Sequence, residues 1–308
     1  MCSQFKNQTD PETIIFIFID GIGFGENNPD INPFARYPAE WFRVLADDSA
    51  KLPAGLIVKT DPTMGLSGLP QSATGQTALF TGINSIEITG KHIAGFPSFS
   101  LKPVLKEKSI LKKFVDHNLK ATLLNGYSKR YFEMISAERH HRFLSASTLI
   151  QLSTGQPLFT IEDVLHDKAL YMDITHWYLQ QEAPEIPLQD PFNAGKKLVT
   201  ISRNYDLTIF EYFFTDRVGH ERDFKMAAKV INDLDRFIAG AVSQMDHTKE
   251  LLVLSSDHGN FEDLSTAGHT TNMVPTFLIG AGENDIAQNI KNIYDIPREI
   301  MRKKNIPF

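Results

Sequence analysis

The chain has 308 residues, 42% of them hydrophobic and 22% charged, and a net charge of −6 at pH 7. These values are typical of a soluble globular protein with one large domain, or with a core and a smaller insertion. The acidic balance without a basic run argues against nucleic-acid binding. The single cysteine, Cys2, excludes an internal disulfide, the polar first twelve residues lack a signal-peptide core, and the apolar run 14–19 is too short to span a membrane. We therefore expect a cytoplasmic protein.

The first predicted element is a strand at residues 13–19, Thr-Ile-Ile-Phe-Ile-Phe-Ile. A run that is apolar on both faces is typical of a strand in the middle of a parallel α/β sheet. The run ends at Asp20, in Asp-Gly-Ile-Gly. Because ligands bind at the carboxyl ends of strands in open α/β sheets, Asp20 is a candidate site residue. The alternative for Asp20 is an Asp-Gly turn.

The segment 68–82 begins as a Gly/Pro/Ser loop and becomes compatible with a helix from Gln76 onward. Ser72 therefore lies where a loop leads into a helix N-terminus, and unpaired N–H groups and the helix dipole favour an anion there. A serine at this place could attack a phosphate. The alternative is that Ser72 is a helix N-cap, a common role for serine, in which case Thr74 is the next candidate nucleophile.

The following segments predict a β-α-β rhythm. A short strand at 56–59 precedes the Ser72 loop, a helix at 109–118 with Ser109 as its cap follows it, and a strand comes at 121–124. The loop 91–97 carries Lys91 and His92, which are candidate contacts for an anionic substrate or, alternatively, solvated loop residues.

Residues 128–197 mix polar, aromatic and charged side chains without a clear βαβ rhythm. We predict a small inserted cap of mostly helices there, on a core formed by residues 1–127 and 198–308. The adjacent His140 and His141 cannot share a helix face and are weak candidates for metal ligands. A cap at this place would set specificity, and its candidate anion contacts, or solvated surface charges, are Lys129, Arg130 and Arg142.

The α/β core resumes with a strand at 207–214, a helix from Asp223 to about 245, and a strand at 250–256. A last strand at 274–279 contains Pro275, which predicts an edge position or a strand start. The final helix is predicted at 296–303, with Asp295 as its cap.

Three of these predicted strands lead to an aspartate, and three histidines follow closely. The carboxyl ends of parallel strands meet at one edge, so these side chains can converge with Ser72. Carboxylates alone would repel one another, and mixed Asp and His ligands suit Zn²⁺ or Mn²⁺ better than Ca²⁺. Six ligand-type side chains are too many for one open catalytic site, and two metal ions about 4 Å apart suit phosphoryl transfer. The six are Asp20, Asp216, His220, Asp257, His258 and His269.

The motifs resemble those of the alkaline phosphatase superfamily of metalloenzymes, closest to the cofactor-independent phosphoglycerate mutases and phosphopentomutases. Asp20 matches the first metal aspartate, Ser72 stands in the place of the nucleophile, and residues 216–220 match the D-x-x-G-H ligand pair. Residues 257–260 match the D-H-G-N signature, and His269 matches the late histidine before a Val-Pro strand. The resemblance covers residues 13–127 and 198–279.

The resemblance implies an α/β fold with an alkaline-phosphatase-like three-layer core, a mostly parallel central sheet and a small inserted cap. It implies two divalent metal ions, Mn or Zn with Mg possible. One ion would be held by Asp20, Ser72, Asp257 and His258, and the other by Asp216, His220 and His269. Ser72 would attack phosphorus and form a phosphoserine, from which water or a second hydroxyl takes the phosphoryl group.

The expected function is therefore a phosphohydrolase or phosphotransferase that acts on a small-molecule phosphate ester. The alternatives are a phosphomutase and a non-catalytic module that binds a phospho-ligand. The insertion is much shorter than the second domain of the phosphoglycerate mutases, and the arginine-rich substrate contacts of that domain cannot be traced here. The sulfatase motif Cys/Ser-x-Pro-x-Arg is absent around Ser72, which argues against sulfate esters.

Overall fold

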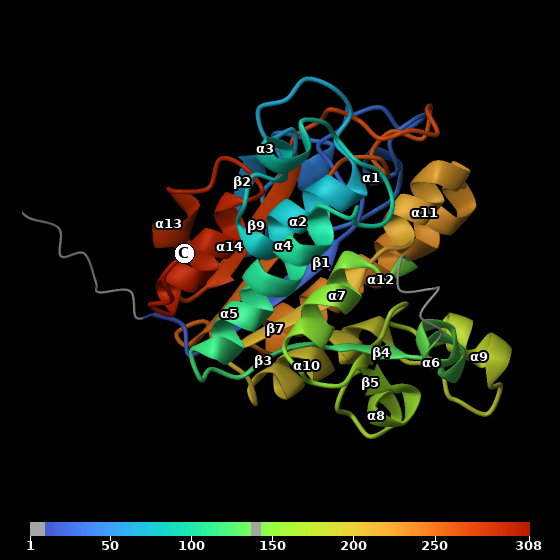
Figure 1. The fold of residues 1–308 in the computed structure, drawn as a ribbon. Helices are drawn as coiled ribbons and strands as arrows, with labels where there is room; N and C mark the ends of the chain where they lie inside the picture. The colour runs from blue at the N-terminus through green and yellow to red at the C-terminus, as the bar shows by residue number, and fades with distance from the viewer. Residues whose placement is uncertain (1–9, 137–142) are drawn as a thin grey trace, which may run out of the picture.

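The computed structural model describes residues 10–136 and 143–308 (Figure 1). Its main sheet has six strands in the order β2-β9-β8-β1-β7-β3. Strand β1 pairs in parallel with β7 and β8, and β3 pairs in parallel with β7. Strand β9 runs antiparallel to both of its neighbours. The predicted mostly parallel sheet is thus confirmed. The strands are β1 (Thr13–Ile19), β2 (Leu56–Thr60), β3 (Ala121–Leu123), β7 (Leu207–Tyr212), β8 (Glu250–Ser255) and β9 (Val274–Gly280).

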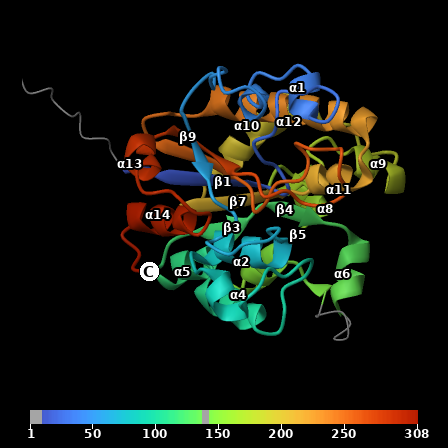
Figure 2. The ribbon, with the colours of Figure 1, turned by 90° about the horizontal axis from the view of Figure 1, so that it is seen from above.

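The predicted three layers are visible in Figure 2, where helices cover both faces of this sheet. Strand β1 shows why, because its side chains alternate between two cores. Ile15, Ile17 and Ile19 pack with the helices of one face, and the side chains between them pack with those of the other. The first face carries α1 (Pro33–Arg36), α10 (Pro191–Ser202) and α12 (Phe224–Gln244). The second carries α2 (Ser72–Thr81), α4 (Leu101–Lys108), α5 (Ile110–Asp116), α7 (Ala146–Ser153) and α14 (Asp295–Lys303).

Most of the local predictions for these elements are confirmed. The Ser109 side chain caps α5 by accepting a hydrogen bond from the Lys112 N–H, and Asp223 caps α12. Two details differ. Strand β9 has a partner on each side, so Pro275 marks the strand start and not an edge. Asp295 is the first residue of α14, after Tyr294 as the N-cap, and its carboxylate instead accepts from the N–H groups of the preceding turn.

The elements within the predicted cap 128–197 pack in different places. Helix α7 packs on the core helices through Leu149 and Ile150, and α10 packs on α12. A smaller lobe lies between them, built on a parallel sheet in the order β5-β4-β6 with a core of its own. Its strands were not predicted because two of them have only two residues. The lobe comprises β4 (Asn125–Tyr127), β5 (Phe159–Thr160), α8 (Ile161–Leu165), β6 (Leu170–Tyr171) and α9 (Trp177–Glu182).

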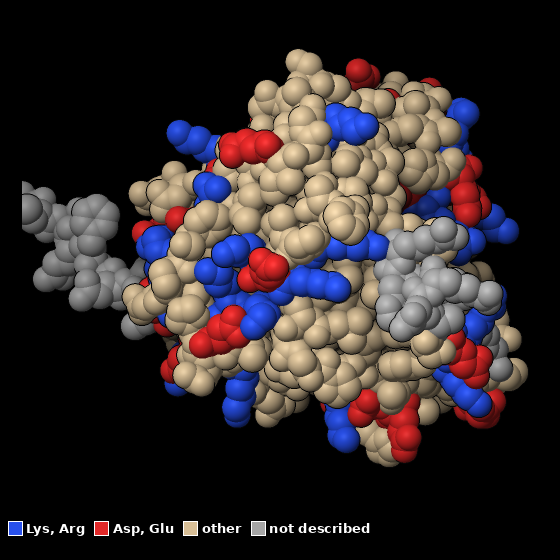
Figure 3. Space-filling view, viewed as in Figure 1, with Lys and Arg blue, Asp and Glu red and all other residues tan. Residues whose placement is uncertain are grey.

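The remaining elements are short or lie at the surface. They are η1 (Arg43–Leu45), α3 (Ser85–Thr89), α6 (Lys129–Ser136), α11 (Phe214–Glu221) and α13 (Glu283–Ala287). No helix in the described ranges is both long enough and apolar enough to cross a membrane. Figure 3 shows Lys and Arg side chains over α4 and α5 with acidic side chains among them, so charges of both signs are mixed on this face.

Candidate metal centre and active site

The ends of three neighbouring strands bring the predicted ligands together. Asp20 directly follows β1, Asp257 lies two residues after β8, and Asp216 lies on α11, which follows β7. Because β7 and β8 both pair in parallel with β1, these three ends lie side by side. The sequence predicts that the three carboxylates converge at this edge of the sheet, because the carboxyl ends of parallel strands lie together.

Asp20, Asp257 and His258 form the first group of ligand-type side chains. Their candidate ligand atoms lie within 4.8 Å of one another, and all three residues are buried. The His258 Nε2 atom is 3.4 Å from Asp20 Oδ1, 3.5 Å from Asp257 Oδ2 and 3.0 Å from Ser72 Oγ. Ser72 therefore adjoins this group through its hydroxyl.

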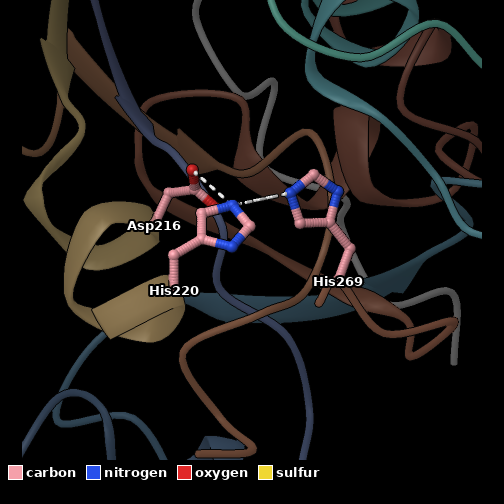
Figure 4. Close-up of side chains that lie close together, drawn as sticks. All are labelled: Asp216, His220 and His269. Atoms are coloured by element: carbon pink, nitrogen blue, oxygen red, sulfur yellow. Dashed lines mark hydrogen bonds and ion pairs between the residues drawn. The ribbon is translucent and has the colours of Figure 1, made fainter. Parts of the chain in front are cut away.

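Asp216, His220 and His269 form the second group (Figure 4). Asp216 and His220 are four residues apart on α11, a spacing that places both side chains on one helix face. The Asp216 carboxylate oxygens are 3.4 Å from His220 Nε2 and 3.5 Å from His269 Nε2. The two Nε2 atoms are 3.3 Å apart, so the three side chains point at one position.

Backbone carbonyls fix the orientation of both imidazoles in the second group. His220 Nδ1 lies 2.7 Å from the Ala267 carbonyl oxygen, and His269 Nδ1 lies 2.8 Å from that of Pro70. A carbonyl can only accept, so each Nδ1 carries the proton, and in the neutral ring Nε2 is then a lone-pair donor. Two facing lone pairs are unfavourable unless a cation lies between them. This arrangement fits a metal ion.

Electrostatics favour a cation at the first group as well. Burial, with the neighbouring carboxylates, raises the pKa of Asp20 and of Asp257. Burial also lowers the pKa of His258, which is therefore neutral and able to act as a ligand. Among the described residues, Asp20 Oδ1 and Asp257 Oδ2 are buried without a hydrogen-bond donor. Buried acceptors of this kind are costly, and a divalent cation removes the cost, so the donor set fits metal binding.

Ser72 is the first residue of α2 and does not cap it. The N-cap is Gln71, which makes no side-chain cap bond, and the Ser72 hydroxyl faces His258. Thr74, the other candidate nucleophile, is fully buried and donates its hydroxyl to the Gln71 carbonyl. The capping alternative therefore does not describe the contacts of Ser72.

Three residues that hold the ligands in place were not predicted. Gln76 lies one helical turn beyond Ser72 and donates to Asp20 Oδ2 at 3.1 Å. Its spacing of four residues from Ser72 can be read from the sequence and could have indicated this role. Asn260 donates to Asp216 Oδ1 at 2.7 Å and belongs to the D-H-G-N motif, where the motif offered a signal. No sequence motif indicates the role of Glu262, because its hydrogen-bond partners come from loops that are distant in the sequence.

Glu262 is a fully buried carboxylate that joins three loops of the site. One oxygen accepts from the N–H groups of Gly23 and Asn260, both at 2.9 Å. The other accepts from the Thr270 hydroxyl and from the Asn272 amide. The loop after β1, the D-H-G-N loop and the loop that carries His269 are thereby connected through one side chain.

A cavity of about 630 Å³ opens beside the two groups, bordered by Asp20, Ser72 and Asp216 on one side. Its other walls mix aromatic, aliphatic and polar residues, and Arg217 is the only Lys or Arg among its described lining residues. Lys91 and His92, which are predicted anion contacts, are not among the residues that border the cavity. Lys91 is exposed, and the half-buried His92 has its Nε2 3.3 Å from the Leu66 carbonyl oxygen.

Two of the predicted anion contacts on the insertion, Lys129 and Arg130, also lie away from the cavity. Lys129 and Arg130 are exposed on α6, where the Lys129 ammonium is 4.0 Å from Glu133. Neither borders the cavity. Arg142, like His140, His141 and Cys2, lies outside the described residues. A contact of these cations with substrate stays a prediction.

Comparison with known proteins agrees with this geometry. Residues 189–305 match the Metalloenzyme superfamily. The 2,3-bisphosphoglycerate-independent phosphoglycerate mutase of Methylobacillus flagellatus is 31% identical over 130 residues, which are 40% of this chain and 24% of that protein. The PH0037 protein of Pyrococcus horikoshii has a TM-score of 0.59 at 14% identity and covers 97% of this chain and 98% of its own. The alkaline phosphatase of the Antarctic bacterium TAB5 has a TM-score of 0.56 at 13% identity, with coverages of 98% and 100%.

Residues 189–305 therefore carry the match to the Metalloenzyme superfamily, and the fold of the chain is similar to that of alkaline phosphatases. The family match implies divalent metal ions, in agreement with the two ligand groups. This metalloenzyme spans only about a quarter of the length of the curated mutase that it matches. The mutase activity of that relative is therefore not assigned to it by similarity.

Proposed function

We propose that this metalloenzyme is a phosphohydrolase that moves the phosphoryl group of a small-molecule phosphate ester to Ser72 and then to water. The observation that carries the proposal is the place of the Ser72 hydroxyl. It lies at the start of α2, 3.0 Å from His258 Nε2, and Ser72 borders the cavity together with Asp20 and Asp216. A nucleophile that adjoins one ligand group and borders the cavity suits attack on a bound phosphate.

The ligand groups divide between two ions in this proposal. Asp20, Ser72, Asp257 and His258 would hold one ion, and Asp216, His220 and His269 the other. Bound divalent ions lower the pKa of a coordinated hydroxyl and neutralise charge on phosphoryl oxygens. Mixed carboxylate and imidazole donors suit Mn²⁺ or Zn²⁺, with Mg²⁺ as a further candidate.

The protein residues supply the positions for two displacement steps. Ser72 loses its proton to solvent, its Oγ forms a bond to phosphorus, and the ester P–O bond breaks. The leaving alkoxide takes a proton and departs as an alcohol. Water then attacks the phosphoserine, releases phosphate and restores the Ser72 hydroxyl. The N-terminal end of the α2 dipole favours the anion beside Ser72 in both steps.

The mutase alternative requires that a second substrate hydroxyl, usually on a molecule with other charges, takes the phosphoryl group. Among the described lining residues, Arg217 is the only cation that could hold such a charge. The cavity therefore favours hydrolysis. A non-catalytic binding module would use the same ligand groups without turnover, and the experiment below separates the two.

The test is release of inorganic phosphate from a panel of phosphate monoesters and diesters, phosphosugars included, with Mn²⁺, Zn²⁺ or Mg²⁺. The parent protein should hydrolyse at least one monoester. Ser72→Ala should lower kcat about a thousandfold or more and keep most of the bound metal, because six ligand side chains remain. Ser72→Thr, which keeps a hydroxyl, is the matched control and should retain measurable turnover.

Metal content tests the ligand assignment separately. Elemental analysis of the reconstituted protein should give about two divalent ions per chain. Asp216→Asn or His269→Ala should remove one ion, and Asp257→Asn the other. A protein that binds phosphate esters tightly but releases no phosphate with any metal would favour the binding module instead.

A further inference from the structure

The cavity beside Ser72 is much larger than a phosphate group needs. Its volume of about 630 Å³ falls in the range of sites that bind whole small molecules. Ser72 borders it together with Asp20 of the first ligand group and Asp216 of the second, and the phosphate would lie beside these three residues. The rest of the space is therefore available to the group that the phosphate esterifies. The residues that border the cavity include Tyr127, Tyr131, Tyr171, Met172 and Phe213, together with the polar residues Gln76, Ser128, Ser145 and Glu211.

The tyrosine hydroxyls on this wall are used inside the protein. The Tyr131 hydroxyl lies 2.6 Å from Thr148 Oγ1, and the Tyr127 hydroxyl lies 3.4 Å from the same atom. The two rings stack with their centroids 4.5 Å apart. With their polar atoms engaged at Thr148, these residues offer mainly carbon surface to a ligand.

The amide on the wall is also engaged. Asn125 donates to the Glu211 carbonyl at 2.8 Å and accepts from the Glu211 N–H at 2.9 Å, so its side chain clamps β4 to β7. The Glu211 carboxyl, buried apart from 9% of its surface, accepts from the Ser147 hydroxyl. Glu211 offers no positive charge to a second anionic group placed in this part of the cavity.

Arg217, the only Lys or Arg in the described lining, uses one of its guanidinium donors inside the protein. The Arg217 guanidinium donates to Glu221 at 2.9 Å and lies over the Tyr178 ring, 5.7 Å from its centroid. A carboxylate or second phosphate of the leaving group that lies away from Arg217 would exchange water for apolar walls and a buried carboxyl. Such burial of an unpaired charge is strongly unfavourable, whereas an uncharged apolar group gains by it.

From these contacts, and resting on phosphoryl transfer at Ser72, we infer the substrate class. The substrate is a phosphate monoester of an uncharged, apolar alcohol of aromatic-ring size, whose hydrocarbon part lies against Tyr131, Met172 and Phe213. Phosphosugars and phosphoglycerate are poor ligands by comparison. The apolar wall selects for the ring and does not compensate a second negative charge placed against it.

Binding tests this inference without turnover. Ser72→Ala protein loaded with Mn²⁺ is titrated calorimetrically with ethyl phosphate, 2-phenylethyl phosphate and 3-phosphoglycerate. The first two share the same alkyl ester linkage and charge, so they differ only in apolar surface. The phenylethyl ester should bind at least about tenfold more tightly than the ethyl ester, as burial of a phenyl group predicts. Phosphoglycerate should bind more weakly than either.

Variants of the wall locate the preference. Tyr131→Ala should reduce the phenylethyl preference to less than about threefold, while Tyr131→Phe, which keeps the ring, should preserve it. Phe99→Ala removes an aromatic side chain that is 94% exposed and does not border the cavity, and it should change nothing. Met172→Ser gives a second test from another element if Tyr131→Ala does not fold.

Equal affinities for the two alkyl esters, or tighter binding of phosphoglycerate, would overturn the inference. Turnover by the parent protein distinguishes a failure of the substrate class from a failure of the proposed hydrolase function. Hydrolysis of ethyl and phenylethyl phosphate with equal kcat/KM would leave the hydrolase intact and remove the substrate class. Preferential binding of the phenylethyl ester without hydrolysis of any ester would contradict the hydrolase and support the apolar site.

Discussion

Glu262 shows how one buried side chain can hold a site that it does not enter. Its two oxygens accept four hydrogen bonds from three loops that carry or adjoin the candidate ligands. A carboxylate can accept at every position, whereas an amide must present an NH₂ group to one pair of donors. The residue is thus a positioning residue, and its negative charge is needed for geometry.

We expect Glu262→Gln to lower both metal affinity and turnover about 10–100-fold, the range found for residues that support metal ligands. Isothermal titration with Mn²⁺ and phosphate release measure the two effects. Glu283→Gln is the matched control. Glu283 also accepts from a backbone N–H, at 2.7 Å, but at the end of the antiparallel β9 and so at the opposite sheet edge. Equal effects of the two substitutions would contradict a positioning role.

Glu211 predicts a pH dependence of stability. Burial raises the pKa of Glu211 to about 7, above its ordinary value of 4.5. The folded state therefore binds the carboxyl proton more tightly than the unfolded state does. The resulting contribution to the free energy of unfolding is fully present below pH 4.5 and is lost as the pH rises through 7. The loss amounts to about 3 kcal/mol at one pKa unit per 1.36 kcal/mol.

Glu211→Gln stays neutral, so its stability relative to the parent protein should rise between pH 5 and pH 8 by up to about 3 kcal/mol. Urea unfolding of both proteins at a series of pH values, with the same metal concentration, measures the difference. A difference that does not change with pH would show that Glu211 titrates normally in the folded protein.

At the scale of elements, helix α2 is fitted to the end of β8. Gly75 lies where a Cβ atom would stand 2.7 Å from the Asp257 carbonyl oxygen and 2.9 Å from the Asp257 Cβ atom. Glycine thus allows the helix that begins with Ser72 to approach the loop that carries Asp257 and His258. The close approach is the reason that Ser72 Oγ can reach His258.

Glycine to alanine in a helix interior usually stabilises a protein by up to about 1 kcal/mol. Here we expect Gly75→Ala to destabilise by about 1–3 kcal/mol, because the backbone of Asp257 cannot move aside easily. Turnover should fall further than stability explains, since Ser72 shifts relative to His258. Denaturant unfolding and phosphate release under identical conditions test both parts, and a variant as stable as the parent would refute the packing argument.

At the scale of the whole molecule, the candidate ions would connect segments that are far apart in the chain. The loop after β1, the start of α2, helix α11, the loop after β8 and the loop with His269 all meet at one edge of the sheet. Ions that bind only the folded protein raise its stability by mass action. The site should therefore contribute to the stability of the fold as well as to catalysis.

Removal of metal with a chelator should lower the unfolding temperature by about 5 °C or more. Each ion at a free concentration 100 times its Kd adds about 2.7 kcal/mol, and each kcal/mol corresponds to a few degrees in a chain of this size. Calorimetry before chelation, after it and after return of Mn²⁺ measures the change. Asp216→Asn should show about half of the shift, and an unfolding temperature insensitive to chelator would argue against both sites.

The sequence alone determined the elements whose pattern is local. The apolar run at 13–19 became the central strand β1, and the caps Ser109 and Asp223 begin helices where they were predicted. The positions of Asp20 and Asp257 could be inferred together because the carboxyl ends of parallel strands share an edge. Periodicity and caps are short-range properties, and a single sequence contains them.

Only the tertiary structure decided the features that depend on distant partners. The strands β5 and β6 have two residues each and therefore show no periodicity in the sequence. The predicted cap for this reason includes the lobe together with helices that pack on the core. The role of Glu262 and the tyrosine wall of the cavity arise from contacts between segments far apart in sequence. Long-range packing sets these contacts, and no local pattern encodes them.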